Sequence, residues 1–114
     1  MGDGDVILAW EQALERVGGD REFLGELVGC FLVDLEGYLA DLREAPDPES
    51  RRAAAHRIKG AARNLGALAL AEACRRAEES GEEQAVAAVE REARRLVAHW
   101  KSPRSPAGPG NQAG

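Results

Sequence analysis

The residues of this chain that could do chemistry are concentrated in one segment, His56-Arg57-Ile58-Lys59-Gly60, within a run that otherwise has the pattern of an amphipathic helix. A helix turns by about 100° per residue, so the polar residues and a further cation share one face: His56, Lys59, Gly60 and Arg63. A glycine inside a helix costs about 1 kcal/mol relative to alanine. The sequence therefore gives up helix stability to place an imidazole towards water, with side-chain bulk removed from the next turn. This arrangement favours presenting a ring nitrogen to a phosphoryl group and to a bulky partner protein.

Each of these residue types suits one task in phosphoryl transfer. A neutral imidazole is a good nucleophile at about pH 7, and its in-line attack on a phosphoryl group requires a ring that protrudes from the surface. We expect Lys59 to place its ammonium beside the phosphoryl oxygens, as a point charge that still allows the group to leave. Gly60 removes the Cβ that would obstruct the partner, and Arg63 lies close enough on the same face to assist.

The elements that must position these residues are helices, because the apolar residues recur at about 3.6 positions almost throughout. A short first helix is predicted after Asp5 and ends at Gly18-Gly19. Asp20 caps a long second helix. Its apolar stripe is Leu24, Val28, Phe31, Leu35, Leu39 and Leu42.

Proline and glycine mark the ends of the later helices. Asp47 fits an N-cap and Pro48 the first position of a third helix, which is predicted to run to Leu65. Gly66 is well placed as the left-handed residue that closes it. A fourth helix ends near Ser80-Gly81, and Ser80 with Glu83 could form a capping box for the last helix. Long amphipathic helices with short loops pack as antiparallel neighbours. We therefore predict an all-α fold, an antiparallel up-down-up-down four-helix bundle with a short additional N-terminal helix.

The composition limits the classes of function. The chain has 114 residues, and we predict one domain at residues 1–101, followed by a disordered Pro/Gly-rich tail at residues 102–114. A net charge of −5 gives no reason to expect binding to nucleic acid or a membrane surface. Without a signal peptide or an apolar stretch of about eighteen residues, a cytoplasmic protein is expected. A monomer is the simpler expectation, because no apolar helix face is left over.

Several other residues have ordinary structural interpretations. Cys30 and Cys74 are expected as reduced, buried thiols. With two histidines and two distant cysteines, no metal site is expected. The acidic residues of the last two helices, Glu78 among them, are expected on the solvated outside of the bundle. One of three glycines in the second helix would permit close packing of a neighbouring helix: Gly25, Gly29 or Gly37.

The chain resembles the histidine-containing phosphotransfer (HPt) domains of two-component phosphorelays. Their His-x-x-Lys-Gly motif reads here as His56-Arg57-Ile58-Lys59-Gly60, and the later aliphatic-Gly pair as Leu65-Gly66. The resemblance implies that His56 accepts a phosphoryl group from the aspartyl phosphate of a receiver domain and passes it to another receiver's aspartate, without ATP hydrolysis. The partners would be response-regulator receivers and a hybrid sensor histidine kinase. The chain itself would bind no cofactor, since the receiver carries the Mg²⁺. Many relatives have a serine just after the motif, whereas this chain has Ala61 and Ala62.

A receiver also needs a surface to dock on. The cations around His56 would complement an acidic receiver pocket: Arg52, Arg57, Lys59 and Arg63. Phe23 and Leu27 lie beside the core stripe of the second helix and are proposed as an apolar docking patch. The alternative function is a helical interaction module that binds a receiver or kinase domain without transfer. A nucleic-acid binder fits poorly with the acidic balance and the absence of stacking aromatics in the third helix.

Overall fold

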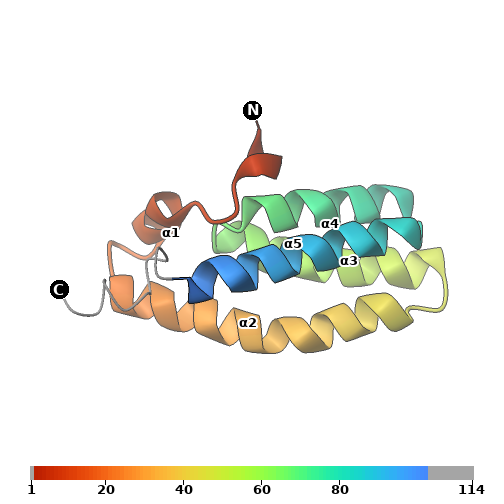
Figure 1. Ribbon diagram of the computed structural model, residues 1–114, viewed down its shortest axis with the longest axis horizontal. Coiled ribbons are helices and arrows are strands. Elements are labelled where there is room, and N and C mark those ends of the chain that lie inside the picture. Colours follow the sequence, from red (N-terminus) through yellow and green to blue (C-terminus); the bar gives the residue numbers. More distant parts are fainter. Residues whose placement is uncertain (1, 103–114) are drawn as a thin grey trace.

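The fold is a bundle of four long helices, as shown by a computed structural model that describes residues 2–102. The elements are η1 (Asp3–Asp5), α1 (Trp10–Arg16), α2 (Arg21–Glu44), α3 (Pro48–Asn64), α4 (Leu68–Ser80) and α5 (Gln84–Lys101). Helices α2 to α5 lie side by side in up-down-up-down order, and α1 lies across one end of the bundle (Figure 1). The predicted all-α, antiparallel four-helix architecture is confirmed.

Two aspartates fix where the long helices begin. The Asp20 carboxylate accepts a hydrogen bond from the Phe23 amide at 3.0 Å, and Asp47 accepts one from the Ser50 amide at 2.7 Å. The bond from the Ser50 amide holds the pKa of Asp47 below its ordinary value. Pro48 occupies the first turn of α3, where its missing N–H costs nothing. Both predicted N-caps are confirmed.

The N-terminal segment differs from the predicted helix after Asp5. Helix α1 begins only at Trp10, because the residues before it are bonded to the turn between α3 and α4 instead of to each other. The Ala9 amide donates to the Gly66 carbonyl, and the Ala69 amide donates to the Val6 carbonyl, both at 2.7 Å. Gly66 has φ +78°, and a Cβ there would lie 2.7 Å from the Ala9 carbonyl oxygen. This close approach requires a glycine at the end of α3.

The predicted capping box of the last helix is wrong. Ser80 is the last residue of α4, and its hydroxyl accepts a hydrogen bond from the Glu82 amide at 3.1 Å. Gly81 follows in the left-handed conformation with φ 66°. That conformation ends α4 and turns the chain. The Glu83 side chain therefore makes no capping hydrogen bond at the start of α5. Helix α3 ends at Asn64, one residue before the predicted Leu65, which is its C-cap.

The core is built from the predicted stripes. All six predicted positions of α2 are buried, and the fully buried Ile58, Leu70, Cys74, Val89 and Leu96 meet them from the other three helices. A second cluster at the α1 end joins Leu14 to Leu24 and Val28, with Trp10 and Trp100 packed against it. The rings of these two tryptophans lie with centroids 5.8 Å apart. Helix α3, which carries His56, is therefore held along its whole apolar face.

Two expectations about small residues in α2 are wrong. Cys30 is exposed and only Cys74 is buried, because Cys30 points away from the α2 core stripe. A Cβ built on Gly25, Gly29 or Gly37 meets no atom within 4 Å, so none of these glycines permits a close helix contact.

Two other expectations concern the ends of the chain and the membrane. The predicted tail at 102–114 falls, except for Ser102, outside the described residues. Within residues 2–102, no helix combines the length and the apolar character that a membrane crossing needs.

Candidate functional site

His56 lies in the middle of α3 and points to solvent. Its side chain is 70% exposed, whereas Ala55 and Ile58 on the other face of the helix are completely buried. Those buried neighbours fix the rotation of α3, so the imidazole stands out from the bundle on a rigid element. This placement is the one that the helical period indicates for His56.

A carboxylate from the neighbouring helix holds the imidazole. The Nδ1 atom of His56 lies 2.6 Å from Glu78 Oε2, and Lys59 Nζ donates to Glu78 Oε1 at 3.0 Å. One carboxylate of α4 thus uses one oxygen for each of two residues of α3. An ionised carboxylate only accepts hydrogen bonds, so Nδ1 carries the proton, and in the neutral ring Nε2 keeps its lone pair. The geometry assigns the free nucleophilic atom to Nε2.

Sequence reasoning missed Glu78 and placed it on the solvated outside. A signal was present, because Glu78 follows the buried Ala71 and Cys74 by seven and four residues. It therefore continues the stripe of α4 that faces the rest of the bundle. A carboxylate on such a stripe needs a partner, and α3 supplies two.

Lys59 is less free than expected. Its side chain is only 16% exposed, and its ammonium forms an ion pair with Glu78. The stem of Lys59 packs against the bundle while the charged head reaches the edge of the site. The lysine is positioned one turn from the imidazole, but it is already bound to a carboxylate in this state.

The electrostatics of the site keep Glu78 ionised. Partial burial alone would raise the pKa of Glu78, but the hydrogen bonds from Lys59 and His56 outweigh burial and bring the pKa below its ordinary value. Cys74, one turn earlier on α4, has its pKa raised to about 12 by burial. The thiol beneath the site therefore stays neutral, and Glu78 is the negative group that faces His56.

Gly60 leaves a gap on the surface beside the imidazole. A Cβ at Gly60 would meet nothing within 4 Å, so no neighbouring helix requires the glycine. Gly60 therefore does not serve a close contact between α3 and another helix. The gap lies one turn beyond His56, on the same exposed face of α3.

The predicted docking arginines have different surroundings. Arg57 forms an exposed ion pair with Asp41 of α2 at 3.3 Å. Arg52 reaches the end of α4, where its Nη2 lies 3.4 Å from the Ser80 carbonyl oxygen. The Arg63 side chain is exposed on the face that carries His56 and Gly60. The structure therefore gives Arg52 a capping contact, Arg57 a partner on α2, and Arg63 an exposed place beyond Gly60.

Phe23 and Leu27 are exposed apolar residues, as predicted, at 46% and 36%. They lie in the first half of α2, which meets the far end of α3 because Leu65 packs against Leu24 and Val28. Val33, also in α2, is a large apolar residue that is 76% exposed, and its exposure was not predicted.

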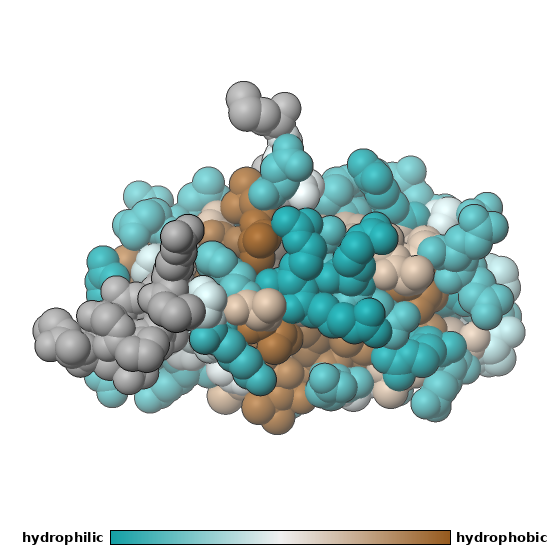
Figure 2. Space-filling view, in the orientation of Figure 1, coloured by the Kyte–Doolittle hydropathy of each residue, from teal (hydrophilic) through white to brown (hydrophobic). Residues whose placement is uncertain are grey.

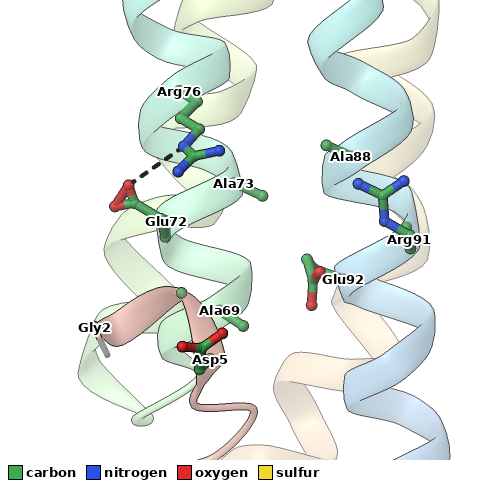
Figure 3. Close-up of a pocket in the computed structure, with 10 residues that line it drawn as sticks. Gly2, Asp5, Ala69, Glu72, Ala73, Arg76, Ala88, Arg91 and Glu92 are labelled. Atoms are coloured by element: carbon green, nitrogen blue, oxygen red, sulfur yellow. Dashed lines mark ion pairs between the residues drawn. The ribbon is translucent and has the colours of Figure 1, made fainter.

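His56 lines none of the best-formed hollows among residues 2–102. One of these hollows, of about 490 Å³, lies between η1, α4 and α5 and is bordered by charged residues (Figure 3): Asp5, Glu72, Arg76, Arg91 and Glu92. Its α4 residues lie on the face of the helix opposite Glu78. A groove of about 330 Å³ between α2 and α5 has Leu32, Leu35 and Val97 in its lining and contributes to the hydrophobic band seen in Figure 2. The candidate site is thus a protruding surface, which suits a macromolecular partner better than a small ligand.

Comparison with known proteins gives one match. A family model described as Hpt domain matches residues 26–101, from the first half of α2 to the end of α5. The matched segment contains His56, Lys59, Gly60 and Glu78. No curated protein and no solved structure matches the chain.

Proposed function

The chain belongs to the Hpt domain family, whose members carry phosphoryl groups in two-component signalling, and from this premise we propose that it is a phosphorelay carrier. His56 accepts a phosphoryl group from the aspartyl phosphate of one receiver domain and passes it to the aspartate of another. Hpt domains are phosphocarrier modules that do not hydrolyse ATP, and they interact with receiver or kinase domains.

The observation that carries this proposal is the exposed imidazole with its proton held on Nδ1. The Nε2 lone pair attacks the phosphorus in line with the bond to the aspartate oxygen. The N–P bond forms, the P–O bond breaks, and its electron pair remains on the aspartate carboxylate. The ring keeps its Nδ1 proton and becomes an imidazolium, hydrogen-bonded to Glu78. Transfer to the second receiver is the same reaction in reverse, and Mg²⁺ and the acidic side chains come from the receiver.

The surroundings of His56 support docking of a folded protein. The missing Cβ of Gly60 leaves room next to the imidazole. Arg63 lies beyond it, and Phe23 and Leu27 form an apolar patch at the same end of α3. A receiver that covers this surface would meet cations next to the phosphoryl group and apolar side chains further out, which favours both steering and affinity.

The test is phosphoryl transfer from a small set of receivers loaded with acetyl phosphate. We expect wild-type chain to take up label in an acid-labile, alkali-stable form. His56→Gln abolishes the label, whereas His99→Gln, which removes the other histidine, at the end of α5, keeps it. Receiver binding without label from any receiver would refute the carrier function and leave the interaction module in its place.

A further inference from the structure

Glu78 binds two residues of α3, and one of them, His56, changes its charge during transfer. Its Oε2 accepts a hydrogen bond from His56 Nδ1 at 2.6 Å, and its Oε1 accepts one from the Lys59 ammonium at 3.0 Å. We infer that Glu78 is a positioning residue that keeps the phosphorylated histidine reactive, so that the carrier can release its phosphoryl group. The inference rests on the proposed role of His56 as phosphoacceptor and concerns how readily that group leaves.

The charge balance of the site explains the direction of the effect. Before transfer, the neutral imidazole, the Lys59 ammonium and the Glu78 carboxylate sum to zero. The phosphoryl group adds about two negative charges, and the ring gains one positive charge because Nε2 has given up its lone pair. Glu78 then attracts the cationic ring through the hydrogen bond at Nδ1 and repels the phosphoryl group on the other nitrogen. The attraction keeps the ring protonated, and the repulsion favours departure of the phosphoryl group.

The hydrogen bond to Nδ1 acts in the same direction. A phosphorylated imidazole that keeps its Nδ1 proton is a cation, and its nitrogen is a good leaving group. When the phosphoryl group leaves to a carboxylate oxygen, the electron pair of the N–P bond returns to Nε2 and the ring becomes neutral again. If the ring first lost the Nδ1 proton, the leaving group would be an imidazole anion, which leaves far more slowly. The Glu78 carboxylate keeps this proton in place.

Few other charges act on this cluster. Cys74 lies next to it on α4, and its pKa of about 12 keeps the thiol neutral. Arg57 turns to Asp41 on α2 and Arg52 to the Ser80 carbonyl at the end of α4. Among residues 2–102, Lys59 and His56 are the groups that lower the pKa of Glu78, against the effect of burial. Removing the Glu78 charge therefore changes only its interactions with His56 and Lys59 in this cluster.

The experiment compares Glu78→Gln with Glu79→Gln. The first variant keeps an oxygen that can accept from Nδ1 but removes the charge. The control removes the charge of the next residue, which pairs with Arg75 instead of with His56. Each purified chain is phosphorylated directly with phosphoramidate, and the half-life of its phosphohistidine is followed from about pH 5 to pH 9.

A charge-assisted hydrogen bond is about twice as strong as a neutral one, so we expect changes of about tenfold. The phosphohistidine of Glu78→Gln should persist about tenfold longer at about pH 8, and the midpoint of its pH profile should fall by about one unit. Glu79→Gln should behave like wild type. Half-lives within about twofold of wild type for Glu78→Gln would overturn the inference.

The outcomes separate this inference from the proposed function. Phosphoramidate loads histidine without a receiver, so Glu78 can be judged even if no receiver transfers to the chain, a result that would refute only the carrier function. Helical circular dichroism checks that Glu78→Gln is folded. If Glu78→Gln is not folded, Glu78→Asp is used instead, because it keeps the negative charge on a shorter side chain. A longer half-life in that variant supports the inference, and an unchanged one overturns it.

Discussion

Replacing Gly60 should make the chain more stable and a poorer carrier at the same time. Gly60 lies inside α3, and a Cβ there meets nothing within 4 Å. A side chain at this position therefore costs no packing within the chain, and it removes the backbone entropy penalty of glycine. No contact within the chain therefore requires glycine here, and under the proposed function the open position leaves room for the partner that covers His56.

The gain in stability can be worked from helix propensity. Gly→Ala in a helix interior is worth about 0.8–1.0 kcal/mol, and for a domain of this size 1 kcal/mol corresponds to about 4–8 °C in Tm. We expect Gly60→Ala to raise the Tm by about 5 °C. Gly60→Leu should raise it by a little less. Thermal unfolding followed by circular dichroism measures both.

The loss of transfer follows from geometry. In-line transfer depends on close placement, and a displacement of about 1 Å can cost about a hundredfold in rate. A leucine one turn from His56 holds a docked receiver further away than that, so Gly60→Leu should lower the transfer rate about a hundredfold. Gly60→Ala should lower it less. Rapid-quench transfer from one labelled receiver gives the rates.

Gly29 provides the matched control. It is also inside a long helix, and its Cβ position is equally open. It lies two turns before Glu36, on the side of α2 that borders α5 instead of α3. Gly29→Ala and Gly29→Leu should raise the Tm as at Gly60 and leave transfer unchanged. Unimpaired transfer by Gly60→Leu would refute the role of Gly60 as clearance, and a fall in Tm would refute the openness of the site.

Two further substitutions test the end of the bundle and the docking patch. Gly66→Ala should lower the free energy of unfolding by about 2–3 kcal/mol, because an L-residue at φ +78° costs about 1–2 kcal/mol and its Cβ would displace Ala9, whose amide bonds to the Gly66 carbonyl. Urea unfolding measures this loss, and stability equal to wild type would contradict the close contact. Phe23→Ala should change stability by less than about 1 kcal/mol, since Phe23 is 46% exposed. It should weaken receiver binding about tenfold. Titration calorimetry with a receiver decides, and an unchanged Kd would remove Phe23 from the docking surface.

Much of the fold was predictable because helix ends and helix faces are local properties. Asp20 and Asp47 cap through bonds to amides three residues on, within one turn of the same chain. The period of about 3.6 residues then sorted the core stripe of α2 from its outer face. The same period placed His56 towards solvent and Ile58 in the core. These conclusions required no knowledge of which helix packs against which.

The parts that were missed depend on contacts between distant segments. Residues 6–9 looked like the start of a helix, but their backbone groups are bonded to the turn around Gly66. The Arg52 side chain reaches the Ser80 carbonyl at the end of α4, a contact that its place in the sequence did not indicate. Cys30 was expected to be buried because cysteine is usually a core residue, but it is exposed and lies away from the apolar stripe of α2.

The candidate site, too, was only partly predictable from the sequence. The sequence by itself determined that an exposed histidine, a lysine and a glycine share one face of a helix, because that follows from spacing alone. Only the tertiary structure decided that Glu78 accepts a hydrogen bond from His56 Nδ1 and binds Lys59. Glu78 is 22 residues from His56, and the meeting of their side chains depends on the axial register of α4 against α3. That register is set by the turn at Gly66 and by the packing of two apolar faces, neither of which is encoded in the spacing of the motif.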